Sequence, residues 1–143
     1  MSPGIIVDTG PVVALLNAEE TLHPWVLEQL AKLSGPMLTC EAVISETLFL
    51  LRRVEGGARQ VTGLLRSGGL RLDFSLATEL PAVSELLVRY RQVPMSLADA
   101  CLVRMSELRP RCQILTFDGH FRIYRRHGRQ AVPAIMPPQG LCS

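Results

Sequence analysis

The 143-residue sequence predicts an α/β fold: a three-layer α/β/α sandwich with a central, mainly parallel sheet. Short apolar runs such as GIIVD (4–8) and QILTF (113–117) are typical of strands buried on both faces. Segments with helical periodicity separate these runs, and such alternation favours parallel strands joined by helices. The length, with 48% hydrophobic and 20% charged residues, fits one globular domain spanning residues 1–143.

The first half of the chain alternates predicted strands with helices. Pro11 suits the first turn of a helix, and Gly35 suits a helix end, because of their backbone preferences. Up to the glycine pair at 56–57 we expect a strand over 4–8, a helix over 12–18, a helix from Pro24 to Gly35, a strand over 37–40 and a helix over 41–51.

The second half predicts the same alternation. The helix over 96–108 is amphipathic, with Leu97, Cys101, Met105 and Leu108 on one stripe. The expected elements are a weaker helix over 58–66, a half-exposed or edge strand over 70–74, helices over 78–92 and 96–108, a strand over 113–117 and a last strand over 131–136.

Composition narrows the class of protein. The N-terminus lacks the pattern of a secretory signal, and no apolar run reaches the roughly 18–20 residues that span a bilayer. We therefore expect a cytoplasmic protein without a membrane segment. Cys40, Cys101, Cys112 and Cys142 are widely spaced, which argues against a zinc site and favours reduced thiols.

The cations are almost all arginine. Lys32 is the only lysine among fifteen cationic residues, and seven arginines fall between Arg104 and Arg129. The net charge of +2 does not by itself indicate nucleic-acid binding. The local excess fits either phosphate contact, for which the guanidinium fork is suited, or a solvated arginine-rich surface.

One acid stands out because of its surroundings. In EAVISETLFLL (41–51), Glu46 has Ala42, Val43, Phe49 and Leu50 at the neighbouring helical positions, with no Lys or Arg among them. The segment therefore predicts a buried helix with an unpaired carboxylate.

Three further acids are expected at the same edge of the sheet. Asp8 and Asp118 end predicted strands, and ligands bind beyond the carboxyl ends of parallel strands. Asp99 lies in the first turn of a predicted helix, and Glu46 lies in the second turn of another. Taken singly, Asp8 fits an Asx-turn, Asp99 a capping box and Asp118 a turn dipeptide. Taken together, the four carboxylates repel one another unless a cation joins them.

Oxygen ligands in a crevice suit Mg²⁺ or Mn²⁺, which can activate water and stabilise a leaving oxygen in phosphodiester hydrolysis. At these residues the sequence resembles the PIN-domain family, and within it the VapC-type toxin ribonucleases. The resemblance covers nearly the whole chain and depends on IIVDTGPVVALL with Asp8, VISETLFLL with Glu46, MSLADACLV with Asp99 and ILTFDGHF with Asp118.

The resemblance implies a PIN-like α/β fold and cleavage of RNA that depends on Mg²⁺ or Mn²⁺. The four acids are then the catalytic and metal-binding residues. The resemblance also implies a homodimer and a cognate antitoxin that occupies the active-site groove. Thr116 matches a hydroxyl that supports the metal or its waters, and Thr9 is a second candidate. A β-branched residue at a strand end is the structural alternative for both.

The arginines after Asp118 are candidates for the RNA backbone, with mainly sequence-independent and salt-sensitive affinity. They are Arg122, Arg125, Arg126 and Arg129. His120 either contacts phosphate or lies on the surface of a turn. Aromatic residues make up 5% of the chain, which argues against binding dominated by base stacking.

Other classes fit less well. A haloacid-dehalogenase-like phosphatase needs an acid where Gly10 stands, a response-regulator receiver needs a lysine much later than Lys32, and no P-loop motif is present. Two alternatives stay open: a non-catalytic PIN-fold module that binds RNA or protein, and a stand-alone PIN nuclease without an antitoxin.

Overall fold

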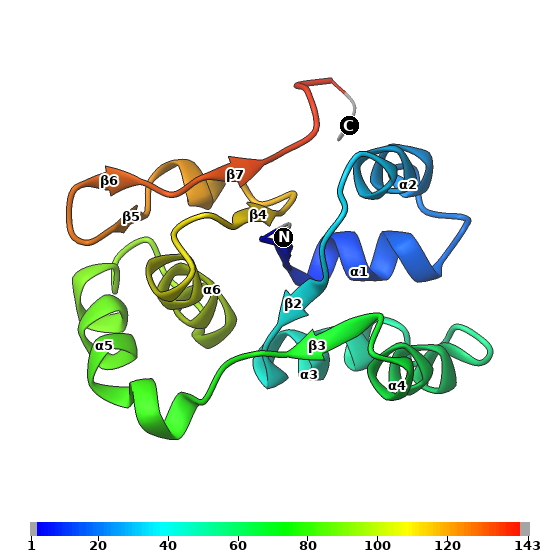
Figure 1. Ribbon diagram of the computed structural model, residues 1–143, viewed down its shortest axis with the longest axis horizontal. Helices are drawn as coiled ribbons and strands as arrows, with labels where there is room; N and C mark the ends of the chain where they lie inside the picture. The colour runs from blue at the N-terminus through cyan, green and yellow to red at the C-terminus, as the bar shows by residue number, and fades with distance from the viewer. Residues whose placement is uncertain (1–2, 141–143) are drawn as a thin grey trace.

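A five-stranded sheet lies at the centre of the computed structural model, which describes residues 3–140 (Figure 1). Its spatial order is β3-β2-β1-β4-β7, and every neighbouring pair is parallel. The strands are β1 Ile5–Val7, β2 Met37–Thr39, β3 Leu70–Leu72, β4 Gln113–Leu115 and β7 Ala134–Ile135. The predicted fold class is confirmed, and the strand expected at an edge, β3, lies at one.

Helices cover both faces of this sheet. Ile6 and Ile114 enter an apolar cluster with side chains of α5 and α6. Ile5 and Leu115 point the other way and pack with side chains of α2 and α4. The alternation along each strand produces the three layers. The helices are α1 Thr9–Leu16, α2 His23–Ala31, α3 Glu41–Leu50, α4 Gly57–Ser67, α5 Leu76–Arg89 and α6 Leu97–Leu108.

The strand expected over 131–136 is divided. Only β7 joins the main sheet, whereas Gln130–Ala131 forms β6 and pairs antiparallel with β5, Arg125–Arg126. Pro133 separates the two short strands and has no N–H to donate to a ladder. A 3₁₀ helix, η1 Gly119–Arg122, precedes this hairpin.

The order of the strands reverses between β1 and β4. From β1 the chain adds β2 and β3 toward one edge, and it then returns to place β4 and β7 on the other side of β1. Ligands of open α/β sheets bind at such a reversal, beyond the carboxyl ends of the strands. Val7 is in register with Leu115, so Asp8 and Thr116 leave the sheet at the same level.

The amphipathic stripe predicted for α6 is wrong. Leu97 and Leu108 are 44% and 47% exposed, whereas the helix buries an almost continuous run from Ala98 to Val103. The reason is that α6 has neighbours on several sides: α5, α3, β1, β4 and β5. A helix enclosed in this way has no single apolar face to detect.

The burial predicted around Glu46 is also wrong. Glu46 is exposed on α3, and two of its helical neighbours, Phe49 and Leu50, are 62% and 53% exposed. The Arg52 guanidinium lies 3.9 Å from the centre of the Phe49 ring and covers part of it. The apolar pattern of this segment therefore describes surface as well as core.

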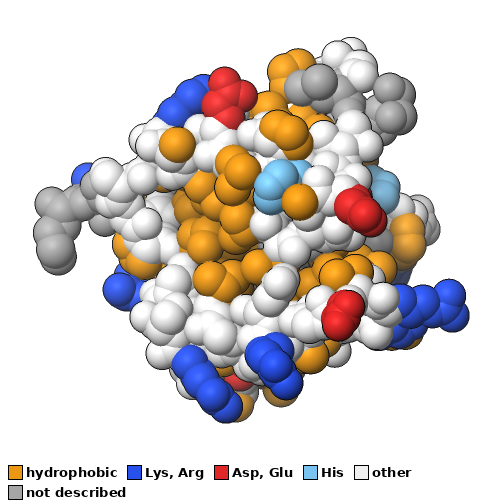
Figure 2. Space-filling view, turned by 90° about the vertical axis from the view of Figure 1, so that its right-hand side faces the viewer, with side chains coloured by type: hydrophobic (Ala, Val, Ile, Leu, Met, Phe, Trp, Pro, Cys, Tyr) orange, Lys and Arg blue, Asp and Glu red, His pale blue; other side chains and the backbone are white. Residues whose placement is uncertain are grey.

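Hydrophobic side chains also gather on the surface. Figure 2 shows them in the middle of one face, with Lys and Arg side chains toward its margin. Contiguous exposed apolar surface is characteristic of interaction sites. The large hydrophobic residues that are exposed are Leu27, Phe49, Leu50, Leu72, Leu80, Val88, Leu97, Leu108 and Ile123.

The cysteines that the structure describes, Cys40, Cys101 and Cys112, are buried free thiols. Cys142 lies outside the described residues. Within residues 3–140, no helix combines the length and the apolar character needed to cross a bilayer.

Candidate active site

The fold brings the four candidate acids to the edge of the sheet where β1 and β4 end. Asp8 follows β1 and caps the N-terminus of α1, and Asp118 follows β4 and caps η1. Asp99 lies in the first turn of α6. Glu46 lies in the second turn of α3. The capping box predicted for Asp99 forms, and Asp118 lies in a turn in which it accepts from the His120 amide. Asp8 caps α1 through the Thr9 amide instead of forming the expected Asx-turn. A structural role and proximity to one site therefore coexist.

Asp8 is buried, and both of its carboxylate oxygens accept hydrogen bonds. Its Oδ1 accepts a hydrogen bond from the Thr9 amide at 2.7 Å, and its Oδ2 accepts one from the Thr116 hydroxyl at 2.7 Å. The pKa of Asp8 is raised to about 6, chiefly by burial. The two hydrogen bonds oppose the shift, and the charges of Asp99 and Asp118 add to it. The three aspartates therefore lie close enough for the charges of Asp99 and Asp118 to act on Asp8.

Thr116 joins Asp8 to Asp118. Its buried hydroxyl donates to Asp8 and accepts a hydrogen bond from the Asp118 amide at 3.0 Å. The Asp118 Oδ1 in turn accepts from the His120 amide at 2.9 Å and lies 3.0 Å from the His120 Nδ1. Thr116 thus fixes the chain where β4 leaves the sheet, and His120 caps Asp118 at the surface.

Glu46 reaches the same group of residues through Thr9. The Thr9 hydroxyl donates to the Glu46 Oε1 at 2.8 Å. Since the Thr9 amide bonds Asp8, one run of hydrogen bonds extends from Glu46 through Thr9, Asp8 and Thr116 to Asp118. Both threonines expected to support the site are part of this network.

Asp99 is held from two sides. The Ser96 hydroxyl accepts from the Asp99 amide at 3.0 Å, and the Ser96 amide donates to the Asp99 Oδ2 at 3.4 Å. The buried Tyr124 hydroxyl donates to the same Oδ2 at 2.7 Å. Burial and this bond to Asp99 raise the pKa of Tyr124. Within the described residues, Asp99 is not part of the hydrogen-bond network that joins Glu46, Asp8 and Asp118. Its negative charge contributes to the raised pKa of Asp8.

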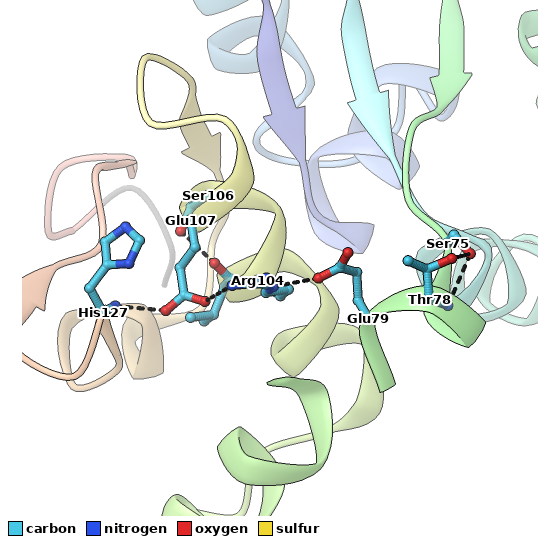
Figure 3. Close-up of polar contacts among 8 residues, drawn as sticks. Ser75, Thr78, Glu79, Arg104, Ser106, Glu107 and His127 are labelled. Atoms are coloured by element: carbon cyan, nitrogen blue, oxygen red, sulfur yellow. Dashed lines mark hydrogen bonds and ion pairs between the residues drawn. The ribbon is translucent and has the colours of Figure 1, made fainter. Parts of the chain in front are cut away.

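Three carboxylates elsewhere in the molecule, Asp73, Glu79 and Glu107, have arginine partners. Arg104 donates through Nε to Glu79 at 2.7 Å and through Nη1 to Glu107 at 3.0 Å (Figure 3). In the described part of the chain, none of the four candidate acids forms an ion pair with Lys or Arg, and only Asp118 has a titratable cation beside it, His120. The acids at the sheet edge are left without a permanent positive charge.

The donors at this edge fit a hydrated Mg²⁺ or Mn²⁺. Among residues 3–140, no three His, Cys, Asp or Glu side chains come together as a ready-made metal cluster. However, Glu46, Asp99 and Asp118 each keep one carboxylate oxygen without a hydrogen bond to the described protein. Mg²⁺ retains several waters and uses one or two direct carboxylates, so this all-oxygen set can hold it partly through water.

The candidate RNA-binding arginines have different surroundings. Arg126 donates through Nη1 to the carbonyls of Ser106 and Pro110, both at 3.2 Å, and its Nε is buried without a partner in the described protein. Arg125 donates to three carbonyls of its own segment, including that of Arg122 at 2.8 Å. The guanidinium groups of Arg125 and Arg126 therefore donate hydrogen bonds to backbone carbonyls of the protein itself.

Arg122 and Arg129 are the two of the four candidates that are free. Both are exposed, and within residues 3–140 neither guanidinium makes a hydrogen bond or ion pair. The Arg122 Nη1 lies over Gly119, where an added Cβ would be 3.3 Å away. Arg122 also lines two surface grooves of about 420 and 330 Å³, one shared with Arg125 and the other with Phe117. A cation with this exposure can reach a bound phosphate.

Comparison with known proteins identifies the family. Residues 5–126 match the family model of the PIN domain, so the chain belongs to the PIN-domain family. Among solved structures, VapC20 of Mycobacterium tuberculosis, a toxin that cleaves the sarcin–ricin loop, is similar with a TM-score of 0.71. The two chains are 27% identical, and the match covers 81% of this chain and 91% of that one. The predicted resemblance to VapC-type PIN domains is confirmed. No curated protein sequence matches the chain.

Two tyrosines near the site have no signal in the sequence. Tyr124 contacts an acid 25 positions earlier, and Tyr90 accepts a hydrogen bond from the Arg125 amide at 2.9 Å. Neither spacing corresponds to a helical or strand period. Both contacts depend on how the chain turns back after η1.

Proposed function

We propose that this chain is an endoribonuclease dependent on Mg²⁺ or Mn²⁺, in which Asp8, Glu46, Asp99 and Asp118 bind the metal and catalyse hydrolysis. Thr9 and Thr116 support them. The observation that carries the proposal is the crowding of aspartates at the strand reversal with no Lys or Arg to neutralise them. Burial is the main cause of the raised pKa of Asp8, and the negative charges of Asp99 and Asp118 add to it; a bound dication would relieve that repulsion.

The residues divide the chemical work. A bound Mg²⁺ or Mn²⁺ would supply an activated water and stabilise charge on the leaving oxygen. Thr9 and Thr116 hold the two oxygens of Asp8 in fixed directions. The Glu46 Oε2 has no hydrogen bond from the described protein, so it would be open to accept a proton or to contact a bound metal.

RNA is the substrate that fits the surroundings. Arg122, next to Asp118 on η1, offers a free guanidinium beside two grooves. Binding through such a contact is mainly electrostatic and weakens with salt. The similarity to VapC20, which cleaves an RNA loop, supports the same substrate class here.

The deciding experiment is RNA cleavage by the purified chain with and without EDTA. We expect cleavage in Mg²⁺ or Mn²⁺, loss of cleavage in EDTA and recovery when the metal is added back. A chain that binds RNA equally with and without EDTA, and never cleaves it, would instead be a non-catalytic PIN-fold module.

We also propose a protein partner for the exposed apolar surface, either a second copy of the chain or an antitoxin. The apolar face of Figure 2 and exposed residues such as Phe49 and Leu50 support this. Light scattering of the purified chain tests the homodimer. Co-expression with the product of the neighbouring open reading frame tests the antitoxin, and a nuclease unaffected by that product would be a stand-alone enzyme.

A further inference from the structure

Tyr124 is a fully buried phenol in direct contact with the candidate site. Its ring packs edge-on against Phe121 and Tyr90, with centroids 5.2 and 5.1 Å away. Its hydroxyl donates to the Asp99 Oδ2 at 2.7 Å. Because the ring is fully buried and packs against these two aromatic rings, the hydroxyl has a defined direction, and this direction is toward a site carboxylate.

The two carboxylate oxygens of Asp99 have different hydrogen-bond partners. Oδ2 accepts from Tyr124 and from the Ser96 amide. Oδ1 has no hydrogen-bond partner within residues 3–140. A carboxylate anchored through one oxygen presents the other at a fixed angle, which is how supporting residues orient metal ligands.

Tyr90 makes the second contact. It lies at the C-terminal end of α5, and its hydroxyl accepts the Arg125 amide at 2.9 Å. Arg125 is bonded in turn to the carbonyl of Arg122. The Tyr90 hydroxyl therefore holds the segment that carries Arg122. The Tyr90 ring packs edge-on against Tyr124.

We propose that these two tyrosine hydroxyls divide the support of the site: Tyr124 positions Asp99 for a divalent cation, and Tyr90 positions the segment of Arg122 for RNA. Both are positioning residues, since each acts through another side chain. The inference depends on the proposed function, because it assigns roles toward that function's metal and substrate.

The test compares Tyr124→Phe with its matched control, Tyr90→Phe. Each change removes one hydroxyl and keeps the ring. We measure the dissociation constant of Mn²⁺ without RNA, and then kcat and KM for RNA cleavage. Tyr124→Phe should weaken Mn²⁺ binding about tenfold, with KM for RNA unchanged at saturating Mn²⁺. Tyr90→Phe should leave Mn²⁺ affinity unchanged and raise KM for RNA.

A double variant shows whether Tyr124 acts through Asp99. In an Asp99→Asn background, Tyr124→Phe should have no further effect on Mn²⁺ affinity, because the oriented carboxylate is already gone. Wild-type Mn²⁺ affinity in folded Tyr124→Phe would overturn the inference. Equal losses of Mn²⁺ affinity in Tyr124→Phe and Tyr90→Phe would overturn the division of roles.

A second measurement does not depend on whether Tyr124→Phe folds. The chain has two tyrosines, so Tyr90→Phe leaves Tyr124 as the only one. Adding Mn²⁺ should then change the tyrosine absorption spectrum, and no change would contradict the assignment of Tyr124. If the wild-type chain binds Mn²⁺ but does not cleave RNA, the proposed function fails, and the Mn²⁺ affinities still test the role of Tyr124.

Discussion

Helix α6 carries two carboxylates that the fold treats in opposite ways. Near its C-terminal end, Glu107 pairs with Arg104 at 3.0 Å and accepts the His127 amide at 2.6 Å (Figure 3). Near its N-terminal end, Asp99 is buried and meets a tyrosine hydroxyl and a backbone amide, with no arginine or lysine beside it. One helix thus holds a glutamate that is paired with an arginine and an aspartate that has no Lys or Arg partner among the described residues.

Under the proposed function, this difference distinguishes an acid with a structural role from an acid that binds the metal. An ion pair that is partly exposed contributes little stability, but it leaves its carboxylate unavailable to ligands. A carboxylate held only by hydrogen-bond donors stays negative and oriented, which is the state that a cation requires. The contrast therefore predicts that changes at Asp99 act on activity and changes at Glu107 act on stability.

The largest effect should come from Asp99→Asn. We expect metal-dependent RNA cleavage to fall by about 100-fold or more, because a metal-binding charge is lost, while circular dichroism shows an intact fold. The matched control is Glu107→Gln on the same helix. It should keep cleavage and lose about 1 kcal/mol of unfolding free energy. Full activity in Asp99→Asn would refute the mechanism.

Asp8→Asn should raise stability at pH 7 in buffer without metal. The pKa of Asp8 rises from its ordinary value of 3.8 to about 6 in the fold, which corresponds to at most about 3 kcal/mol of destabilisation when Asp8 is ionised. Asn has a similar shape and carries no charge, but its NH₂ group cannot accept the hydrogen bond from the Thr116 hydroxyl, so the gain should be smaller than this limit. Urea unfolding of both proteins measures the gain, and cleavage activity should be lost in the variant.

The pH dependence of this gain identifies its cause. Between about pH 4 and 6 the folded chain keeps a proton on Asp8 that the unfolded chain has released, so wild-type stability falls as the pH rises through this window. The advantage of Asp8→Asn should therefore be present at pH 7 and absent below pH 4. An advantage of equal size at both pH values would point to packing instead of charge.

Arginines extend the same comparison to cations. Arg104 is occupied by two glutamates, whereas Arg122 is free beside the site. Arg122→Ala should weaken RNA binding severalfold and reduce the slope of log affinity against log salt by about 1. Arg111→Ala removes an exposed charge at the opposite edge of the sheet and should change neither quantity. Filter binding at several salt concentrations measures both.

Glu46→Gln should have the smallest effect on stability. If Glu46 were buried and unpaired, as its sequence context suggested, the change would stabilise the metal-free protein. Glu46 is exposed and bonded to Thr9, so we expect a change within about 0.5 kcal/mol by thermal unfolding. Cleavage should still fall strongly, because the charge of the candidate base is removed. A large stability gain would mean that Glu46 is under strain in the metal-free protein.

The order and type of the main elements could be predicted, because apolar runs and helical periods alternate clearly along the chain. The alternation also placed Asp8 and Asp118 at one edge, since parallel strands end together. The surroundings of Glu46 could not be predicted, because the same period in Phe49 and Leu50 describes a core face or an exposed apolar face equally. The roles of the four acids stay predictions until they are tested by substitution.

The contacts that orient the acids could be predicted even less well from the sequence. Thr116 was expected to support the site through the family resemblance, but its bonds to Asp8 and to the Asp118 amide follow from the register of β1 and β4. Tyr124 reaches Asp99 only because η1 and the short hairpin return over α6. Such contacts depend on the path of the chain, which no local pattern encodes.

The pairing of β1 with β4 also determines when the candidate site can form during protein synthesis. Asp8 and its partner Thr116 are 108 positions apart, and the N-terminal part of a chain leaves the ribosome first. A nascent chain interrupted before residue 116 has one side of β1 uncovered and has neither Thr116 nor Asp118. Translation products that end before residue 116 therefore lack part of the candidate site, and the proposed activity would require synthesis to proceed past Asp118.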